Sequence, residues 1–401
     1  MLRWANRRNI LLFLDTNHYR HTSGRYECLC AAEAEETISD LPASATNDWW
    51  FGHISYDYKN QLEQLESRHP QRFRFPGLSF FRPAIVCYIR RDEPRVHIET
   101  TGADPRQVWA EISSECSDQK HTPPAQQPLQ FRKRMDREQY LKQLASVKEH
   151  IRRGDCYELN FCNEAYCTAD IAPLTVFEKL NALSPAPFAA YYKWQDQYLM
   201  SSSPERYLYK EGTTVLAEPI KGTAPRSPDP AQDLAYKTQL AASIKERAEH
   251  VMIVDLMRND LARFCLPGSI RVDDLYGIHA FPRVYQMIST VSGQVREPFL
   301  WPDAIRHSFP MGSMTGAPKI MVMQLIDRYE QARRELFSGT VGYISPAGDF
   351  DFNVVIRSLF YNAADRYLAY QTGGAITWDS DPLQEWEETL LKAMALEQVF
   401  Q

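Results

Sequence analysis

The stretch that decides the fold class runs from residue 339 to residue 399. It begins with three strand-like runs, Gly-Thr-Val-Gly-Tyr-Ile-Ser at 339–345, Asn-Val-Val-Ile-Arg-Ser-Leu-Phe at 353–360 and Tyr-Leu-Ala-Tyr-Gln at 367–371. No helical pattern separates these runs, and a helix is predicted only afterwards, at 383–399. Strands and helices therefore come in uneven groups rather than in strict βαβ alternation, which favours an α+β fold with large antiparallel sheets.

Working outward from this stretch, the only linker-like change in composition lies at residues 121–128, His-Thr-Pro-Pro-Ala-Gln-Gln-Pro. Before it, short apolar runs at 49–52 and 84–89 are bounded by Pro, Asp or Asn, as strands are. We therefore predict a strand-rich N-terminal part over residues 1–120 and a mixed region over residues 130–401, closely packed into one unit.

Three helical patterns stand out in the second region. Asp136 followed by Gln139 forms a capping-box pattern, and Gly154 ends the helix that it opens. A long helical pattern covers about residues 234–264, and a third helix begins at Pro318, in the first-turn position that proline favours, and runs to about residue 329.

Composition excludes several classes of protein. The 45 Lys and Arg against 51 Asp and Glu give a net charge of −6, without the basic tract that nucleic acid or anionic lipid would require. No stretch approaches 18 consecutive apolar residues, so we expect a cytoplasmic protein with no membrane span. The eight cysteines include no CxxC pair, which argues against zinc and disulfides. None lies in a G-x-C-x-G elbow, so a glutaminase within the chain is not expected.

A lysine followed by glycine, Lys221-Gly222, ends a strand-like run at residues 219–223. Taken alone it fits a surface turn. An amine held in a closed pocket would instead lose solvation, its pKa would fall, and it would become a nucleophile or base. The glycine would let a ligand approach the backbone closely.

Two pairs of carboxylates repeat one spacing on two predicted helices. Glu246 and Glu249 lie three residues apart, as do Glu385 and Glu388, so each pair shares a helix face. Such pairs are commonly solvated. If the two faces met across a cleft, they would supply the oxygen ligands that Mg²⁺ prefers.

Anion-binding groups are predicted in two further places. Residues 312–319 form a glycine-punctuated loop before a helix N-terminus, which attracts carboxylates or phosphates, although its spacing is not that of a nucleotide P-loop. Arg357 lies in an apolar strand pattern and needs an anionic partner, either a protein carboxylate or a substrate. Together the residues predict a pocket for a small, multiply anionic ligand, with Mg²⁺ on one carboxylate and Arg357 or Lys319 on another.

From Met135 to the C-terminus the chain resembles the chorismate-utilising enzymes, which include the anthranilate, aminodeoxychorismate, isochorismate and salicylate synthases. Residues 51–57 look like the family's N-terminal part. The resemblance implies two large, mainly antiparallel β-sheets packed together with helices on the outside. It rests on Ser203–Arg206, Pro219–Thr223, Arg247–Leu256, Arg258–Leu261, Gly312–Lys319, Gly342–Ser345, Asp351–Asn353, Ile356–Arg357 and Asp379–Pro382.

One position separates the branches of this family. Anthranilate synthases carry alanine where this chain has Lys221, whereas Pro-Ile-Lys-Gly-Thr is typical of aminodeoxychorismate synthase component I, also called para-aminobenzoate synthase component I. In that branch the resemblance implies that Lys221 attacks carbon 2 of chorismate, that Glu205 protonates the departing 4-hydroxyl, and that ammonia adds at carbon 4. The product, 4-amino-4-deoxychorismate, leads to p-aminobenzoate and folate, and the ammonia would come from a separate glutamine amidotransferase subunit.

The resemblance also assigns the binding residues. Mg²⁺ would be held on the ring carboxylate by Glu249 and Glu388, with Glu246 and Glu385 reaching it through water. The residues that would line the chorismate site are Gly222, Thr223, Ser313, Lys319, Tyr343, Arg357 and Gly374.

Two departures and two alternatives accompany this assignment. Gln286 stands where anthranilate synthases have histidine, and Glu158 aligns with the water-activating lysine of isochorismate synthases, which disfavours water addition. The alternatives are anthranilate synthase component I and a non-catalytic chorismate-binding subunit.

Attack near neutral pH requires the pKa of Lys221 to lie well below about 10.4 through desolvation, and the pKa of Glu205 to be raised by burial.

Overall fold

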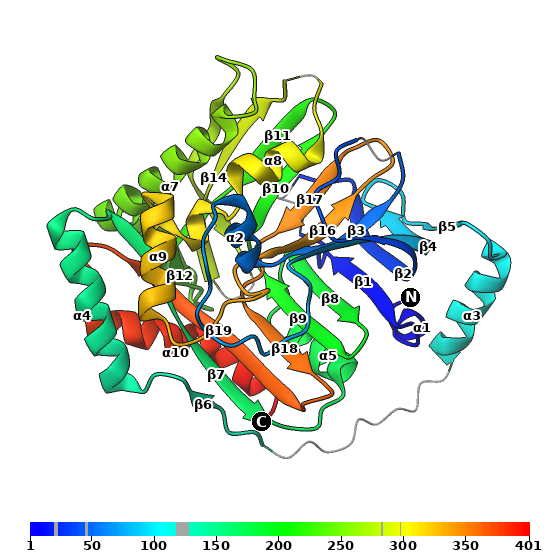
Figure 1. The fold of residues 1–401 in the computed structure, drawn as a ribbon, viewed down its shortest axis with the longest axis horizontal. Coiled ribbons are helices and arrows are strands. Elements are labelled where there is room, and N and C mark those ends of the chain that lie inside the picture. Colours follow the sequence, from blue (N-terminus) through cyan, green and yellow to red (C-terminus); the bar gives the residue numbers. More distant parts are fainter. Residues whose placement is uncertain (20–22, 45–46, 118–127, 282–283, 297) are drawn as a thin grey trace.

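The computed structural model describes residues 1–19, 23–44, 47–117, 128–281, 284–296 and 298–401 (Figure 1). Most of the linker predicted at 121–128 lies outside these residues. The described strands are β1 Ile10–Asp15, β2 Tyr26–Ile38, β3 Trp50–Ile54, β4 Leu78–Arg90, β5 Val96–Thr100, β6 Arg132–Lys133, β7 Glu158–Thr168, β8 Phe188–Trp194, β9 Gln197–Ser203, β10 Arg206–Glu211, β11 Thr214–Glu218, β12 Ile220–Pro225, β13 Arg271–Ala280, β14 Val284–Gln294, β15 Gly316–Ala317, β16 Thr340–Ile344, β17 Phe350–Asn353, β18 Ser358–Asn362 and β19 Tyr367–Ile376.

Helices lie between and around these strands. They are α1 Leu2–Ala5, α2 Lys59–Leu62, α3 Pro105–Ser117, α4 Arg137–Arg153, α5 Pro173–Leu183, α6 Pro230–Ala242, α7 Ile244–Ala262, α8 Trp301–Ser308, α9 Lys319–Tyr329 and α10 Pro382–Gln398, with 3-10 turns η1 Tyr56–Tyr58 and η2 Gly312–Met314. The predicted α+β class is confirmed.

The described strands form one continuous antiparallel network. Its main path runs β13–β14–β11–β10–β17–β16–β3–β4–β2–β1–β8–β9–β18–β19–β7, with β12 also paired to β14. The two sheets expected from the sequence are the two halves of this network. N-terminal strands β1 to β4 join the halves, because β1 pairs with β8 and β3 pairs with β16.

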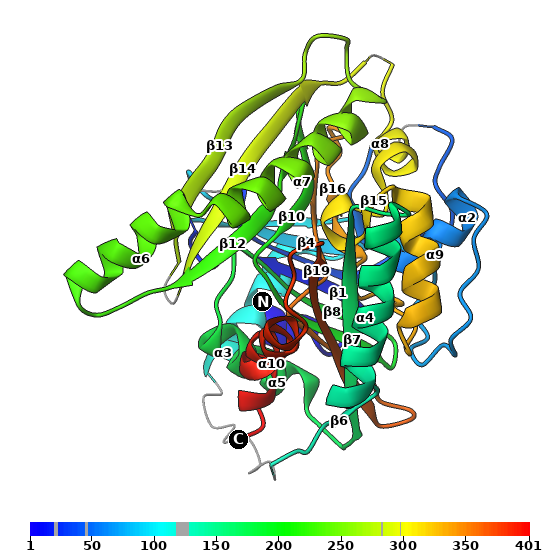
Figure 2. The same cartoon turned by 90° about the vertical axis from the view of Figure 1, so that its left-hand side faces the viewer.

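A shared apolar core lies between the two halves. Tyr192 and Leu199 from one half and Leu208 and Phe352 from the other belong to a single cluster of buried side chains. Side chains alternate between the two faces of a strand, so Met200, next to Leu199, faces the other side of the sheet. There it packs in a second cluster that includes side chains of α3, α5 and α10. Figure 2 shows α10 and α5 together, and α6 and α7 lying along β12 and β14.

Several predicted elements have different limits in the structure. Helix α4 is as expected, with the Asp136–Gln139 capping box and Gly154 in the left-handed conformation at its end. The long helix predicted at 234–264 is two helices, because Ser243 adopts an extended conformation and its hydroxyl accepts the backbone N–H of Glu246. The strand predicted at 353–360 is also interrupted: β17 ends at Asn353, β18 begins at Ser358, and Arg357 between them has a φ of 52°.

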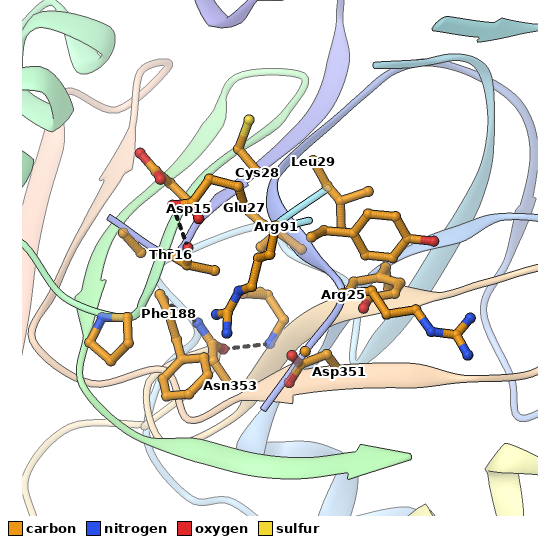
Figure 3. A pocket seen from close by; sticks show the side chains of 17 residues that line it. Asp15, Thr16, Arg25, Glu27, Cys28, Leu29, Arg91, Phe188, Asp351 and Asn353 are labelled. Atoms are coloured by element: carbon orange, nitrogen blue, oxygen red, sulfur yellow. Dashed lines mark hydrogen bonds between the residues drawn. The ribbon is translucent and has the colours of Figure 1, made fainter. Parts of the chain in front are cut away.

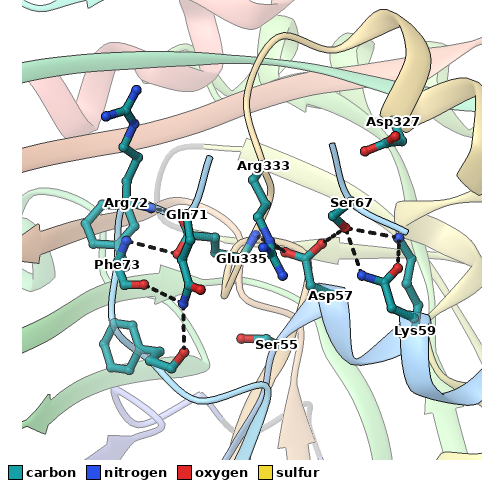
Figure 4. Close-up of polar contacts among 12 residues, drawn as sticks. Ser55, Asp57, Lys59, Ser67, Gln71, Arg72, Phe73, Asp327, Arg333 and Glu335 are labelled. Atoms are coloured by element: carbon teal, nitrogen blue, oxygen red, sulfur yellow. Dashed lines mark hydrogen bonds and ion pairs between the residues drawn. The ribbon is translucent and has the colours of Figure 1, made fainter. Parts of the chain in front are cut away.

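A buried polar network ties the segment after β3 to the loop after α9 (Figure 4). Asp57 accepts a hydrogen bond from the backbone N–H of Glu335 at 2.9 Å and pairs with Arg333 at 2.9 Å. The carboxylate of Glu335 in turn accepts the backbone N–H groups of Arg72 and Phe73. These contacts fix the loop that carries Arg334.

Arg334 connects this loop to η2 and β7. Its guanidinium is paired with Glu330 and donates to the backbone carbonyls of Met314 at 2.6 Å and Asn160 at 2.8 Å. Both ion-pair partners are buried. The pair therefore holds η2 against the start of β7, next to Ser313 and Glu158.

Candidate functional site

Lys221 lies on β12 in a cluster of acidic side chains. Its ammonium donates to Oε1 of Glu158 at 2.8 Å, and the exposed fractions of the two side chains are 12% and 2%. Burial alone would lower the pKa of Lys221, but the nearby carboxylates of Glu158, Glu249 and Glu205 outweigh it, and the pKa is raised. The predicted low pKa is therefore wrong for this state of the protein, because the prediction omitted Glu158. We call Lys221, Glu158, Glu205 and Glu249 the lysine cluster.

Glu205 reaches the cluster from the turn between β9 and β10. Its backbone carbonyl accepts the N–H of Val354 at 3.0 Å, and the neighbouring Arg206 is anchored by Asp351 and Glu218. Burial raises the pKa of Glu205 to about 7, against the opposing effects of a hydrogen bond with Ser313 and of nearby Lys221. The predicted upward direction is confirmed, and Glu205 can hold a proton near neutral pH.

The four predicted metal ligands come from two helices that approach β12 and β19. A Cβ added to Gly222 would lie 2.9 Å from Oε2 of Glu246, and one added to Gly374 would lie 2.9 Å from Oε2 of Glu385. Burial raises the pKa of Glu249 to about 7. Within the residues that the structure describes, no three His, Cys, Asp or Glu side chains lie close enough together to form a metal site.

Two lysines compensate the charge of these carboxylates. Lys245 of α7 lies 3.9 Å from Glu249. On α10, burial raises the pKa of Glu385 and the charge of Lys245 opposes this, while Lys392 and, more weakly, Lys245 lower the pKa of Glu388. Lys392 pairs with Glu388 at 2.6 Å and donates to the carbonyl of Gly373 at 2.7 Å. The charge of Lys245 therefore acts on carboxylates of both helices.

The predicted chorismate-binding residues divide into two groups. Gly222 and Thr223 follow Lys221 on β12, Ser313 bonds to Glu205, and Gly374 faces Glu385 and Glu388. Arg357 is near Glu388, and burial lowers its pKa. Its guanidinium has no hydrogen bond or ion pair within the described residues, although it was expected to need an anionic partner.

Lys319 and Tyr343 are not brought to the lysine cluster. The ammonium of Lys319 is held by both oxygens of Asp260, at 3.0 and 3.1 Å, and by the carbonyl of Ser308 at 2.9 Å. The ammonium is therefore engaged by a protein carboxylate in this structure, and its role in binding substrate stays a prediction.

Tyr343 packs against Tyr26 and Trp49 and lines a pocket that contains no member of the lysine cluster. Figure 3 shows this pocket, where Asp15, Arg25 and Asp351 are among the side chains of the lining. Tyr343 lies on a strand whose neighbouring residues face opposite sides of the sheet, so a motif that contains it does not reveal which side it serves.

Comparison with known proteins gives the family. A model of the chorismate binding enzyme family matches residues 7–398. The chain belongs to this family. Aminodeoxychorismate synthase component 1 of Escherichia coli (strain K12) is 37% identical over 343 residues, which cover 85% of this chain and 74% of that protein. Anthranilate synthase component 1 of Streptomyces coelicolor is 37% identical over 259 residues, covering 64% of this chain and 50% of that protein.

Solved structures show the same fold. Anthranilate synthase component I from Streptococcus pneumoniae TIGR4 aligns with a TM-score of 0.76 at 23% identity, covering 91% of this chain and 83% of that one. The menaquinone-specific isochorismate synthase of Escherichia coli aligns with a TM-score of 0.79 at 16% identity, covering 100% and 91%. These likenesses establish the fold that the resemblance predicted. Among the described helices, none is both long and apolar enough to span a bilayer.

Sequence reasoning missed part of the site of this chorismate-binding enzyme. It treated Glu158 only as an alignment difference, because Glu158 and Asn160 alternate with Leu159 and Phe161 as the polar face of a half-exposed strand would, and this pattern does not mark the carboxylate as buried. Lys245 and Lys392 carried no signal beyond ordinary helix-surface spacing. Gln286, on β14 beside Thr223, has a buried Oε1 with no hydrogen-bond partner within the described residues.

Proposed function

We propose that this chorismate-binding enzyme is an aminodeoxychorismate synthase component I, which converts chorismate and ammonia to 4-amino-4-deoxychorismate. The observation that carries the proposal is a buried lysine amine placed among Glu158, Glu205 and Glu249. The sequence similarity to the Escherichia coli protein of that name supports it.

In the proposed reaction, Lys221 is the nucleophile and Glu205 is the general acid. The free amine of Lys221 attacks carbon 2, the ring double bonds shift, and the 4-hydroxyl leaves as water with the proton of Glu205. Ammonia then attacks carbon 4, the double bonds shift back, the bond between carbon 2 and Nζ breaks, and the extra proton on the added nitrogen restores Glu205. A pKa of about 7 suits Glu205 to this role, because it is protonated at neutral pH and can still give up its proton.

The carboxylates of α7 and α10 fit Mg²⁺ by their chemistry. They supply only hard oxygen donors, the lysine Lys245 already places a positive charge near both helices, and a side chain at Gly374 would crowd Glu385. We propose that Glu249 and Glu388 bind the ion directly and that Glu246 and Glu385 act through water. Bound Mg²⁺ would neutralise the ring carboxylate of chorismate.

Arg357 is proposed to hold a second anionic group of the substrate. A half-buried guanidinium without a hydrogen-bonded partner is costly, so the arrangement of Arg357 favours a ligand that brings its own carboxylate. Chorismate carries two.

We further propose that a separate glutamine amidotransferase subunit supplies the ammonia and that the protein acts in the cytoplasm, for p-aminobenzoate and folate synthesis. The designation "component 1" of the Escherichia coli relative supports a partner subunit.

Purified protein incubated with chorismate, Mg²⁺ and ammonium tests the proposal. We expect 4-amino-4-deoxychorismate, and we expect intact mass spectrometry without ammonium to detect a chorismate-derived adduct, less one water, on Lys221. The Lys221→Ala variant should form neither. Accumulation of anthranilate would instead place the chain with the anthranilate synthases, which the 37% identity to the Streptomyces coelicolor protein keeps as the second candidate.

A further inference from the structure

Glu158 is placed to exchange a proton with the amine of Lys221. It is the first residue of β7, held by pairing with Ala317 of β15. Its Oε1 accepts from Lys221 at 2.8 Å, while its Oε2 is buried and has no hydrogen-bond partner within the described residues. One oxygen of this carboxylate is therefore engaged by the lysine, and the other is unpartnered.

Other charged groups face the amine without a hydrogen bond to it. Glu205 approaches from the β9–β10 turn, Glu249 from α7 and Glu388 from α10, and each interacts with Lys221 electrostatically. His250 of α7 lies near the backbone of Lys221, and burial lowers the pKa of its imidazole to about 4, so it is neutral. Within the described residues, the hydrogen bonds of Lys221 Nζ lead only to Glu158.

The charged amine presents a chemical problem that this arrangement solves. An ammonium has no lone pair, so Lys221 must lose a proton before it can attack carbon 2. Transfer to Glu158 would convert a buried ion pair into a neutral amine and a neutral acid, leaving the net charge of the pair unchanged. An ion pair is costly to strip of water, so a substrate that displaces water from the pair favours the transfer.

We propose that Glu158 is the proton acceptor and donor for Lys221, an inference that rests on the proposed function. Glu158 takes a proton from Nζ before the amine attacks carbon 2. The adduct nitrogen then keeps its two remaining protons while Glu205 protonates the leaving hydroxyl. When ammonia has added at carbon 4 and the bond to Nζ breaks, Glu158 returns its proton and the resting ion pair is restored.

The test compares adduct formation on Lys221 in the wild type and in Glu158→Gln, in single turnovers with chorismate and Mg²⁺ and without ammonium, between pH 5 and pH 7. In the wild type the pair retains its proton internally, so with Mg²⁺ saturating at every pH the rate should change little across this range. In Glu158→Gln the amine must lose its proton to solvent, so the rate should be about 10²-fold lower at pH 6 and should rise about tenfold per pH unit.

Two further variants separate this role from a structural one. Glu158→Asp keeps a carboxylate and should recover part of the rate together with the weak pH dependence of the wild type. Glu387→Gln, an exposed residue of α10, should behave as the wild type does.

Three results would overturn the assignment. The first is a Glu158→Gln rate profile that matches the wild type, and the second is a Glu158→Gln variant that is faster at every pH because its lysine is no longer held charged. The third is a Glu158→Asp variant that shows the steep pH dependence expected of Glu158→Gln. A wild-type protein that forms neither adduct nor aminodeoxychorismate would refute the proposed function itself, whereas a normal wild type with an unchanged Glu158→Gln profile refutes only the role of Glu158.

Discussion

Replacing Glu205 with glutamine should strongly reduce activity and, at alkaline pH, stabilise the protein. Burial raises the pKa of this carboxyl from 4.5 to about 7 in the folded protein. Between these values the folded protein keeps a proton that the unfolded chain has released, so stability falls as pH rises through this window and is constant above it. Glutamine cannot ionise and avoids this loss.

The size of the effect follows from the same pKa values. Integrating the difference in bound protons from pH 5 to pH 8.5 gives about 2.5 kcal/mol that the wild type loses and the Glu205→Gln variant does not. For a chain of 401 residues, an unfolding entropy of about 0.8 kcal/mol/K converts this free energy into about 3 °C in melting temperature.

The assay is thermal unfolding of both proteins at pH 5 and pH 8.5. The melting temperature of Glu205→Gln minus that of the wild type should be about 3 °C larger at pH 8.5 than at pH 5. Other titrating groups affect both proteins equally and cancel in the difference. Activity should fall by about 10²- to 10⁴-fold, as is usual on loss of a general acid.

The control is Glu387→Gln, which removes an exposed carboxylate from α10 and should show the same difference in melting temperature at both pH values. If Glu205→Gln also shows a pH-independent difference, Glu205 does not carry a raised pKa in the folded protein and the reasoning fails.

Two further predictions concern the metal ligands and the anchoring of the β9–β10 turn. Gly374→Ala places a Cβ 2.9 Å from Oε2 of Glu385. In a titration with Mg²⁺, this variant should stay folded but need a Mg²⁺ concentration about 10- to 100-fold higher for half-maximal activity. Gly102→Ala, with open space around the added carbon, is the matched control, and equal Mg²⁺ dependence in the two variants would count against the metal assignment. Arg206→Met leaves two largely buried carboxylates without their cation and should lower the free energy of unfolding, measured with denaturant, by about 3–5 kcal/mol. The control, Arg258→Met, removes an exposed ion pair and should lower it by less than about 1 kcal/mol. Similar losses in both would show that the Arg206 pairs contribute no more to stability than an exposed ion pair does.

Local sequence signals predicted elements whose ends are marked by specific residues. The capping box at Asp136 and the glycine at 154 define α4, because each satisfies backbone groups that the helix leaves unpaired. The breaks at Ser243 and Arg357 were missed because the apolar pattern continues across both positions. A serine inside a helical pattern and an arginine inside a strand pattern do not by themselves signal a change of backbone conformation.

The lysine cluster was predicted only in part, because its members are brought together by tertiary structure. The residues Lys221 and Glu158 are 63 positions apart in the chain, and their contact depends on the loop that Arg334 anchors. For the same reason the sequence could not show that Lys319 is held by Asp260 or that Tyr343 lines a pocket away from the lysine cluster.

Strands β1 to β4 lie between β8 and β16, and this position has a practical consequence for engineering the protein. A shortened chain that started at residue 130 would leave β8 and β16 each with a bare row of backbone N–H and C=O groups, which readily recruit other chains. We therefore expect such a fragment to aggregate, whereas the same two pieces produced as separate polypeptides in one cell could complete each other's sheet.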